Sequence, residues 1–152
     1  MHAPSLNKMA FQATVHCLIG CAIGEVLGLV IGTAFGFSNL ATIILSIVLA
    51  FVFGYGLSLR SVTRSGVAFS AALTLVLAAD TLSITTMEIT DTFIMLVIPG
   101  AMGAGLADWL FWLSMAFSLV VAFVAAYPVN RYLLSKHKGH ALLHPHRTHH
   151  HQ

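Results

Sequence analysis

The stretch that decides the fold class is residues 10–36, AFQATVHCLIGCAIGEVLGLVIGTAFG, in which Glu25 is the only acidic or strongly basic residue. A helix needs roughly 20 apolar residues to cross a bilayer core about 30 Å thick, and this run is longer. It is also longer than a signal-peptide core and lacks a convincing cleavage site, so we expect it to be retained. The sequence therefore predicts a first transmembrane helix here.

Three further apolar runs follow, at residues 40–59, within 66–98 and at 109–134. Hydrophobic residues make up 58% of the chain and charged residues 8%, with a mean hydropathy of +0.90, which is unlike a soluble domain. We expect an all-α integral membrane protein, a bundle of about four transmembrane helices within residues 1–135. The third span is unusually polar, and we expect it to be long or broken near residues 83–86.

The basic residues all flank the same end of the predicted bundle. The short connections at residues 37–39 and 99–105 contain no Lys or Arg; the basic residues are Lys8, Arg60, Arg64, Arg131, Lys136, Lys138 and Arg147. The positive-inside rule therefore predicts cytoplasmic N- and C-termini in a bacterial inner (cytoplasmic) membrane. These residues are too few and too scattered to form a nucleic-acid-binding patch, so we expect no nucleic-acid partner.

Four of the five acidic residues lie inside apolar spans, namely Glu25, Asp80, Glu88 and Asp91. A carboxylate in a bilayer costs at least ~2.5 kcal/mol unless it is protonated, paired or facing a wet cavity. Such residues are functional candidates, although a neutral, hydrogen-bonded packing role is the alternative. Because the second and fourth spans carry no internal charge, we expect the first and third spans to face each other.

The first span also carries glycines at four-residue spacing: Gly20, Gly24, Gly28, Gly32 and Gly36. Such a row forms a smooth ridge that lets another backbone approach closely. We expect the third span to pack on this face, and the same face is a candidate surface for a homo-oligomer.

Thiol, imidazole, thioether and carboxylate groups gather on the first and third spans. Counting inward from the loops places Cys21 level with Asp80, and Glu25 level with Met87 and Glu88. These groups resemble a soft-metal ligand set, and copper is the leading metal. The candidate metal ligands are His16, Cys17, Cys21, Glu25, Asp80, Met87, Glu88 and Asp91. The cysteines have the alternative role of buried packing residues.

Residues 136–152 form a predicted flexible, cytoplasmic, histidine-rich tail. Its histidines are His137, His140, His144, His146, His149, His150 and His151. Such tracts bind transition metals, which suggests exchange with a metal donor or acceptor protein. Histidine-rich ends also occur without a specific role.

Five short motifs stand out: HCLIGCAIGE at residues 16–25, ADT at 79–81, MEITD at 87–91, YPVNR at 127–131 and KGHA at 138–141. Together they resemble a bacterial integral membrane family described only as a domain of unknown function. The resemblance implies a small multi-span membrane protein and supplies no activity or site residues.

Three classes of function remain open. We favour a permease or channel that handles a cation, with a transition metal such as copper as the first choice. The alternatives are a proton-coupled small-solute carrier and a noncatalytic membrane scaffold or assembly factor. We expect no enzyme, because the sequence has no nucleophile elbow, phosphate loop or HExxH motif.

Overall fold

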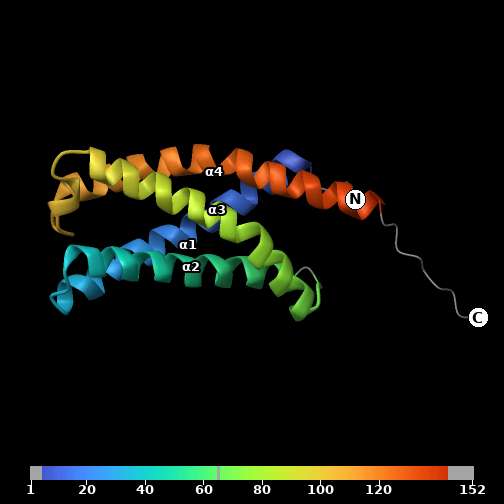
Figure 1. Ribbon diagram of the computed structural model, residues 1–152, viewed down its shortest axis with the longest axis horizontal. Helices are drawn as coiled ribbons and strands as arrows, with labels where there is room; N and C mark the ends of the chain where they lie inside the picture. The colour runs from blue at the N-terminus through green and yellow to red at the C-terminus, as the bar shows by residue number, and fades with distance from the viewer. Residues whose placement is uncertain (1–4, 65, 144–152) are drawn as a thin grey trace, which may run out of the picture.

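All the regular secondary structure in the described part of the chain is helical. The computed structural model describes residues 5–64 and 66–143, with side chains as far as residue 136. The elements are α1 (Leu6–Ala34), α2 (Asn39–Arg64), α3 (Phe69–Val97), the 3-10 turn η1 (Ala101–Gly103) and α4 (Trp109–Leu143) (Figure 1). The four α-helices are each long and apolar enough to span a membrane. The predicted all-α bundle of four membrane helices is confirmed.

The fourth helix runs further than the sequence predicts. We expected the span to end at residue 134, whereas α4 continues to Leu143. Extending an existing helix adds one hydrogen bond for each residue fixed, so polar residues can continue a helix beyond the apolar run. The first part of the predicted tail is therefore helical, and residues 144–152 lie outside the described residues.

Gly36 ends α1 rather than extending its glycine row. Its φ of 67° is in the left-handed region, which glycine adopts without a steric penalty. The Gly36 N–H donates to the Thr33 carbonyl at 3.3 Å, and the Phe37 N–H donates to the Gly32 carbonyl at 2.8 Å. This pair of bonds is a Schellman motif. The prediction that Gly36 belongs to the packing row is therefore wrong.

The third span is long and continuous, because α3 covers 29 residues without interruption. At 1.5 Å per residue it is about 43 Å long and exceeds the bilayer core. The predicted alternative of a break near residues 83–86 is wrong, because the helix itself satisfies the threonine hydroxyls. Thr86 Oγ1 donates to the Leu82 carbonyl and Thr90 Oγ1 to the Thr86 carbonyl, both at 2.7 Å. Such bonds form within the helix and do not require a break in its backbone hydrogen bonds.

The glycine row of α1 packs on α2, and the prediction that it faces the third span is wrong. A Cβ added to Gly20 would lie 2.6 Å from the Gly54 Cα, and one added to Gly24 would overlap Ala50. The reason is that α2 presents its own row of small residues at four-residue spacing: Thr42, Ser46, Ala50 and Gly54. Two smooth surfaces allow the backbones to approach closely. Because α2 covers this face, the row is not free to join a second copy.

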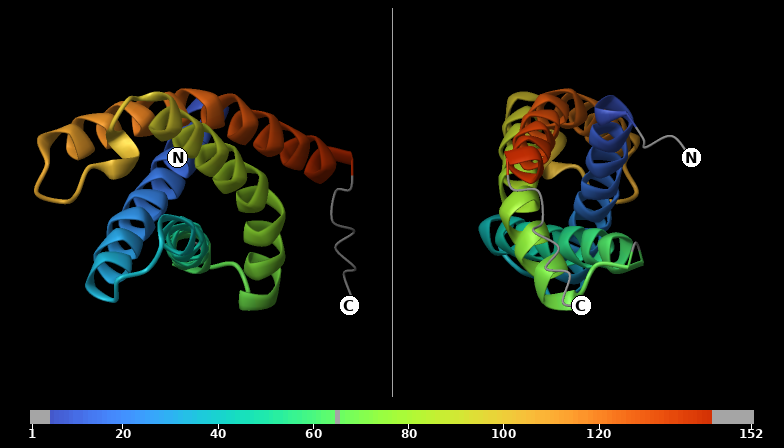
Figure 2. Two further views of the ribbon diagram at one scale, coloured as in Figure 1. Left: turned by 60° about the vertical axis from the view of Figure 1, so that its left-hand side comes forward. Right: turned by 90° about the vertical axis from the view of Figure 1, so that its right-hand side faces the viewer.

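Helices α1 and α3 lie between α2 and α4, whose backbones do not approach each other closely in the described part of the chain (Figure 2). On α4, the buried side chains facing the bundle also recur every fourth residue: Ser114, Ser118, Ala122, Ala126 and Asn130. The Asn130 amide donates to Thr14 Oγ1 of α1 at 2.9 Å. The interior between α1 and α3 is therefore closed by small or polar side chains.

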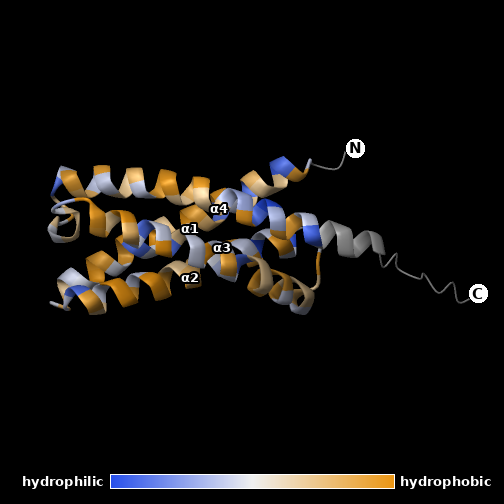
Figure 3. Cartoon of the chain, turned by 45° about the horizontal axis from the view of Figure 1, so that its top comes forward, coloured by the Kyte–Doolittle hydropathy of each residue, from blue (hydrophilic) through white to orange (hydrophobic). Residues whose placement is uncertain are grey.

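Large apolar side chains cover the outside of the helices. Figure 3 shows that hydrophobic residues predominate along the helices, with hydrophilic ones in the middle of the bundle and at the start of α1. Val52, Phe93 and Val124 are all more than half exposed. Such a surface fits a lipid environment.

The start of α1 and the latter part of α4 lie together, since Arg131 Nε donates to Asn7 Oδ1 at 2.8 Å. We call this end of the bundle, with the α2–α3 connection, the basic end. The other end, with the α1–α2 and α3–α4 connections, we call the opposite end.

Candidate functional site

The four carboxylates inside the spans turn toward the interior of the bundle. Asp80, Glu88 and Asp91 are only 6%, 5% and 7% exposed, and Glu25 is partly buried. Because α3 is continuous, residues 80, 87 and 91 fall on one stripe of that helix. The polar groups of α1 and α3 form three layers along the bundle.

The first layer lies nearest the basic end. Cys17 is fully buried next to Ser83 and Asp80 of α3. Ser58 of α2 also borders this layer, and His16 is an electrostatic neighbour of Asp80. The His16 ring is 2.7 Å from the Gln12 carbonyl through Nδ1. A carbonyl only accepts, so Nδ1 carries a proton and Nε2 is the nitrogen left for another partner.

The second layer contains sulfur. The Cys21 thiol lies 4.0 Å from the Met87 thioether, and each of these residues is 1% exposed. Glu88 is the other close neighbour of the Cys21 thiol. Ile84 and Ala50 belong to the same buried cluster as the two sulfur-bearing side chains. We call Cys21 and Met87, with these apolar neighbours, the sulfur layer.

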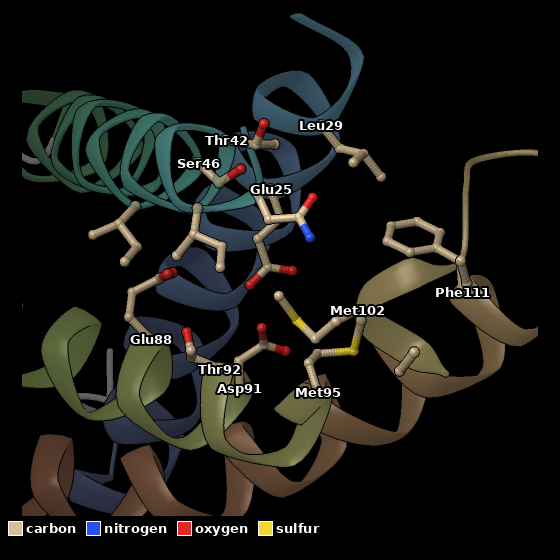
Figure 4. Close-up of a pocket in the computed structure, with 15 residues that line it drawn as sticks. Glu25, Leu29, Thr42, Ser46, Glu88, Asp91, Thr92, Met95, Met102 and Phe111 are labelled. Carbon is tan, nitrogen blue, oxygen red and sulfur yellow. The ribbon is translucent and has the colours of Figure 1, made fainter. Parts of the chain in front are cut away.

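The third layer is acidic and lies toward the opposite end. Glu25 of α1 has Asp91 and Glu88 of α3 as its electrostatic neighbours. Figure 4 shows the Glu25 and Asp91 carboxylates turned toward each other, with the Met102 side chain beside them. Asp91 also accepts a hydrogen bond from the Ser118 hydroxyl of α4. Three acidic side chains are therefore gathered in one region.

The observed layers differ from the predicted levels by about one helical turn. We expected Cys21 at the level of Asp80, but Cys17 lies there. Cys21 instead lies beside Met87 and Glu88, where we expected Glu25. The prediction assumed straight helices with equal depth counts from the loops, and helix tilt shifts such counts.

Two pockets reach these layers from different sides. One of about 430 Å³ contains His16, Asp80 and Asn130 among its lining residues. The other, of about 120 Å³, is lined in part by Glu25 and Glu88 (Figure 4). The sulfur layer lies between the two acidic ends of these pockets, because Cys21 and Met87 are buried between Asp80 and Glu25 along the helices.

Several buried oxygens along the layers lack a hydrogen-bond partner within the described residues: Glu25 Oε1, Asp80 Oδ2, Ser83 Oγ and Glu88 Oε1. Buried polar atoms are normally paired, and ionised carboxylates repel one another strongly where water is excluded. The acidic layer therefore contains unpaired carboxylate oxygens of Glu25 and Glu88 in one buried region.

The eight predicted ligands form a row rather than one metal cluster. No group of three or more His, Cys, Asp or Glu side chains that could hold a metal ion occurs among the residues whose side chains are described. In the tail, His137 and His140 fall on the α4 backbone with their side chains outside the described part. His144, His146, His149, His150 and His151 lie outside the described residues altogether.

Sequence reasoning missed several polar and sulfur-bearing groups of the site. Met95 and Met102 line the smaller pocket, and Ser58 and Asn130 line the larger one. Ser118 was missed as well, although it bonds Asp91. Ser118 and Asn130 belong to the α4 row in which buried residues recur every fourth position, and this spacing was a usable signal for both. No signal of this kind marks Met102, which is in the short turn after α3.

A family model described as "Domain of unknown function (DUF4396)" matches residues 6–139 of the chain. The match covers all four candidate membrane spans, the last of which is Trp109–Lys136, and confirms the resemblance to a family of unknown function. No curated protein and no solved structure matches the chain.

Proposed function

The chain belongs to the DUF4396 family, and we propose that it is a permease that passes a soft cation, Cu(I), through the bundle between α1 and α3. The path runs from the acidic layer, through the sulfur layer, to Cys17, Asp80 and His16. We place the basic end in the cytoplasm of a bacterial inner membrane by the positive-inside rule.

The observation that carries the proposal is the composition of the closed layer between the two pockets. A cation moving between Glu25 and Asp80 passes the Cys21 thiol and the Met87 thioether, which lie 4.0 Å apart. Thiolate and thioether ligands select Cu(I), whereas Mg²⁺ and Ca²⁺ need oxygen ligands. The narrow part of the path therefore suits a soft ion.

Passage of an ion requires several weak binding sites with few ligands each. A site that coordinated the ion fully would retain it. Soft groups occur on both sides of the sulfur layer: Met95 and Met102 line the pocket at one side, and Cys17 and His16 lie on the other. This spacing supplies successive sites.

The carboxylates offset the charge of the cargo. Glu25, Glu88 and Asp91 lie together where the dielectric constant is low, so an entering cation is attracted strongly.

Flux measurements on the full-length protein in proteoliposomes test the proposal. Cu(I), kept reduced, is added outside, and a Cu(I)-binding dye inside reports its arrival. Cys21→Ser and Met87→Leu should each lower the flux at least about tenfold, because the replaced group is a far poorer ligand for Cu(I). Met115→Leu is the matched control for the sulfur layer, since Met115 is also buried but belongs to the cluster of Phe111 and Met95 and not to that of Cys21 and Met87. Met→Leu nearly conserves volume, so both variants should fold.

The proposal fails if wild-type vesicles take up no more Cu(I) than empty vesicles. It also fails if Met87→Leu and Met115→Leu give the same flux as the wild type.

A proton-coupled small-solute carrier is the second candidate, and the acidic layer favours it. None of the described residues that line the pocket at Glu25 is Lys or Arg, so the carboxylates there are suited to holding protons. A proton flux that Glu25→Gln abolishes and Cys21→Ser leaves unchanged would select this function over Cu(I) passage.

A further inference from the structure

A further pocket of about 280 Å³ lies at the basic end of α2 and shares His16 and Ser61 with the 430 Å³ pocket. Arg60 and Arg64 are four residues apart on α2, so both side chains lie on the same face of the helix. Both line the pocket, together with His16 of α1, Leu57 and Ser61. The pocket thus brings two guanidinium groups and an imidazole to one place.

No acidic residue lines this pocket, although its His16 is an electrostatic neighbour of Asp80. Arg131 at the same end of the bundle does not line it, and its guanidinium donates to the neutral Asn7 amide oxygen at 2.8 Å. The positive-inside rule explains why basic residues occur at this end, but it does not explain why two of them converge on one concave site.

We propose that this pocket binds a phosphate-bearing anion. Two guanidinium groups offer planar forks of N–H donors that match the oxygens of a phosphate group. Arg60 and Arg64 carry this site, and neither lies on the proposed Cu(I) path.

The phosphate can come from two sources. The pocket lies at the end of α2, beyond its apolar run, and basic pockets between membrane helices bind anionic lipid headgroups. Free phosphate in solution presents the same tetrahedral, negatively charged group.

Native mass spectrometry of the full-length protein in a neutral detergent separates these sources. The probes are dihexanoyl phosphatidylglycerol, dihexanoyl phosphatidylcholine and inorganic phosphate, each added alone. In a further experiment, inorganic phosphate competes with phosphatidylglycerol. The Arg60→Gln/Arg64→Gln double variant removes both charges but keeps polar side chains. Arg131→Gln is the matched control, with one charge removed at the same end.

Phosphatidylglycerol should bind the wild type and the Arg131→Gln control alike, and the double variant about tenfold more weakly. If phosphatidylglycerol binds and excess phosphate does not displace it, the pocket is a site for a lipid headgroup. If the wild type binds inorganic phosphate but not phosphatidylglycerol, and the double variant loses the phosphate, the pocket is a site for free phosphate. The proposal is overturned if the double variant retains every anionic probe as the wild type does, or if no anionic probe exceeds phosphatidylcholine.

Discussion

Replacing Gly24 by alanine should separate α1 from α2. A Cβ at this position would overlap the backbone of Ala50 and would lie 2.7 Å from the Leu49 carbonyl carbon, whereas ordinary contact begins at 3.4 Å. The atoms in the way belong to the backbone of a helix, so no side-chain rotation can relieve the overlap. The two helices must move apart along the whole contact.

The magnitude follows from two opposing effects. Alanine favours a helix over glycine by about 0.8–1.0 kcal/mol, which by itself would stabilise the variant. Forcing an extra carbon into a close-packed contact costs about 1–3 kcal/mol, because neighbouring atoms are pushed off their optimal separation. We expect Gly24→Ala to be destabilised relative to a glycine-to-alanine change that meets no obstacle.

Gly56 provides that control, because nothing lies within 4 Å of a Cβ built on it and it belongs to the same helix pair. Unfolding of the purified protein in mixed micelles can be followed by the fluorescence of Trp109 and Trp112, both on α4. Gly56→Ala should unfold at the wild-type denaturant concentration or above it, and Gly24→Ala clearly below it. Equal unfolding curves for the two variants would refute the close approach of α1 and α2.

Two further predictions concern the polar contacts and the orientation. Thr14→Val removes the acceptor of the buried Asn130 amide and should lower the unfolding free energy by about 0.6–2 kcal/mol in the same micelle assay. Thr74→Val is the control and should leave the unfolding free energy unchanged, because it alters an exposed hydroxyl bonded to its own helix. A cysteine placed at Gly103 should react with an impermeant maleimide added outside intact cells. Background labelling should be low, because both native cysteines are buried. Reaction only after the cytoplasm is opened would reverse the assigned orientation.

The helices were predictable because their signals are local. Span length and the interruption of apolar runs are properties of short windows, so each predicted start lies within a few residues of the observed one. The end of α4 was not predictable in this way. A helix that has left the membrane is no longer limited by hydropathy, and α4 continues to Leu143.

Partner choice and register were not predictable from one helix at a time. The glycines of α1 indicate a close approach but not which helix makes it, and the answer lay in the small residues Ser46, Ala50 and Gly54 of α2. The layers of the site depend on how α1 and α3 tilt against each other. A shift of one turn moves a residue by about 5.4 Å, enough to place Cys17 rather than Cys21 beside Asp80.

The short turn at Gly36 also affects how the chain is made. Only residues 35–38 join α1 to α2, so the two helices can pair soon after both have left the ribosome, with little entropy lost in closing the loop. The α3 span follows, with a hydropathy of 1.4 against 2.0 and 2.4 for α1 and α2, and with three carboxyl groups to bring into the bilayer. By then the nascent chain already offers Cys21, Glu25 and the hydroxyls of α2 as neighbours. A permuted gene that encoded α3 first would expose those carboxyl groups to lipid before any polar neighbour had been synthesised.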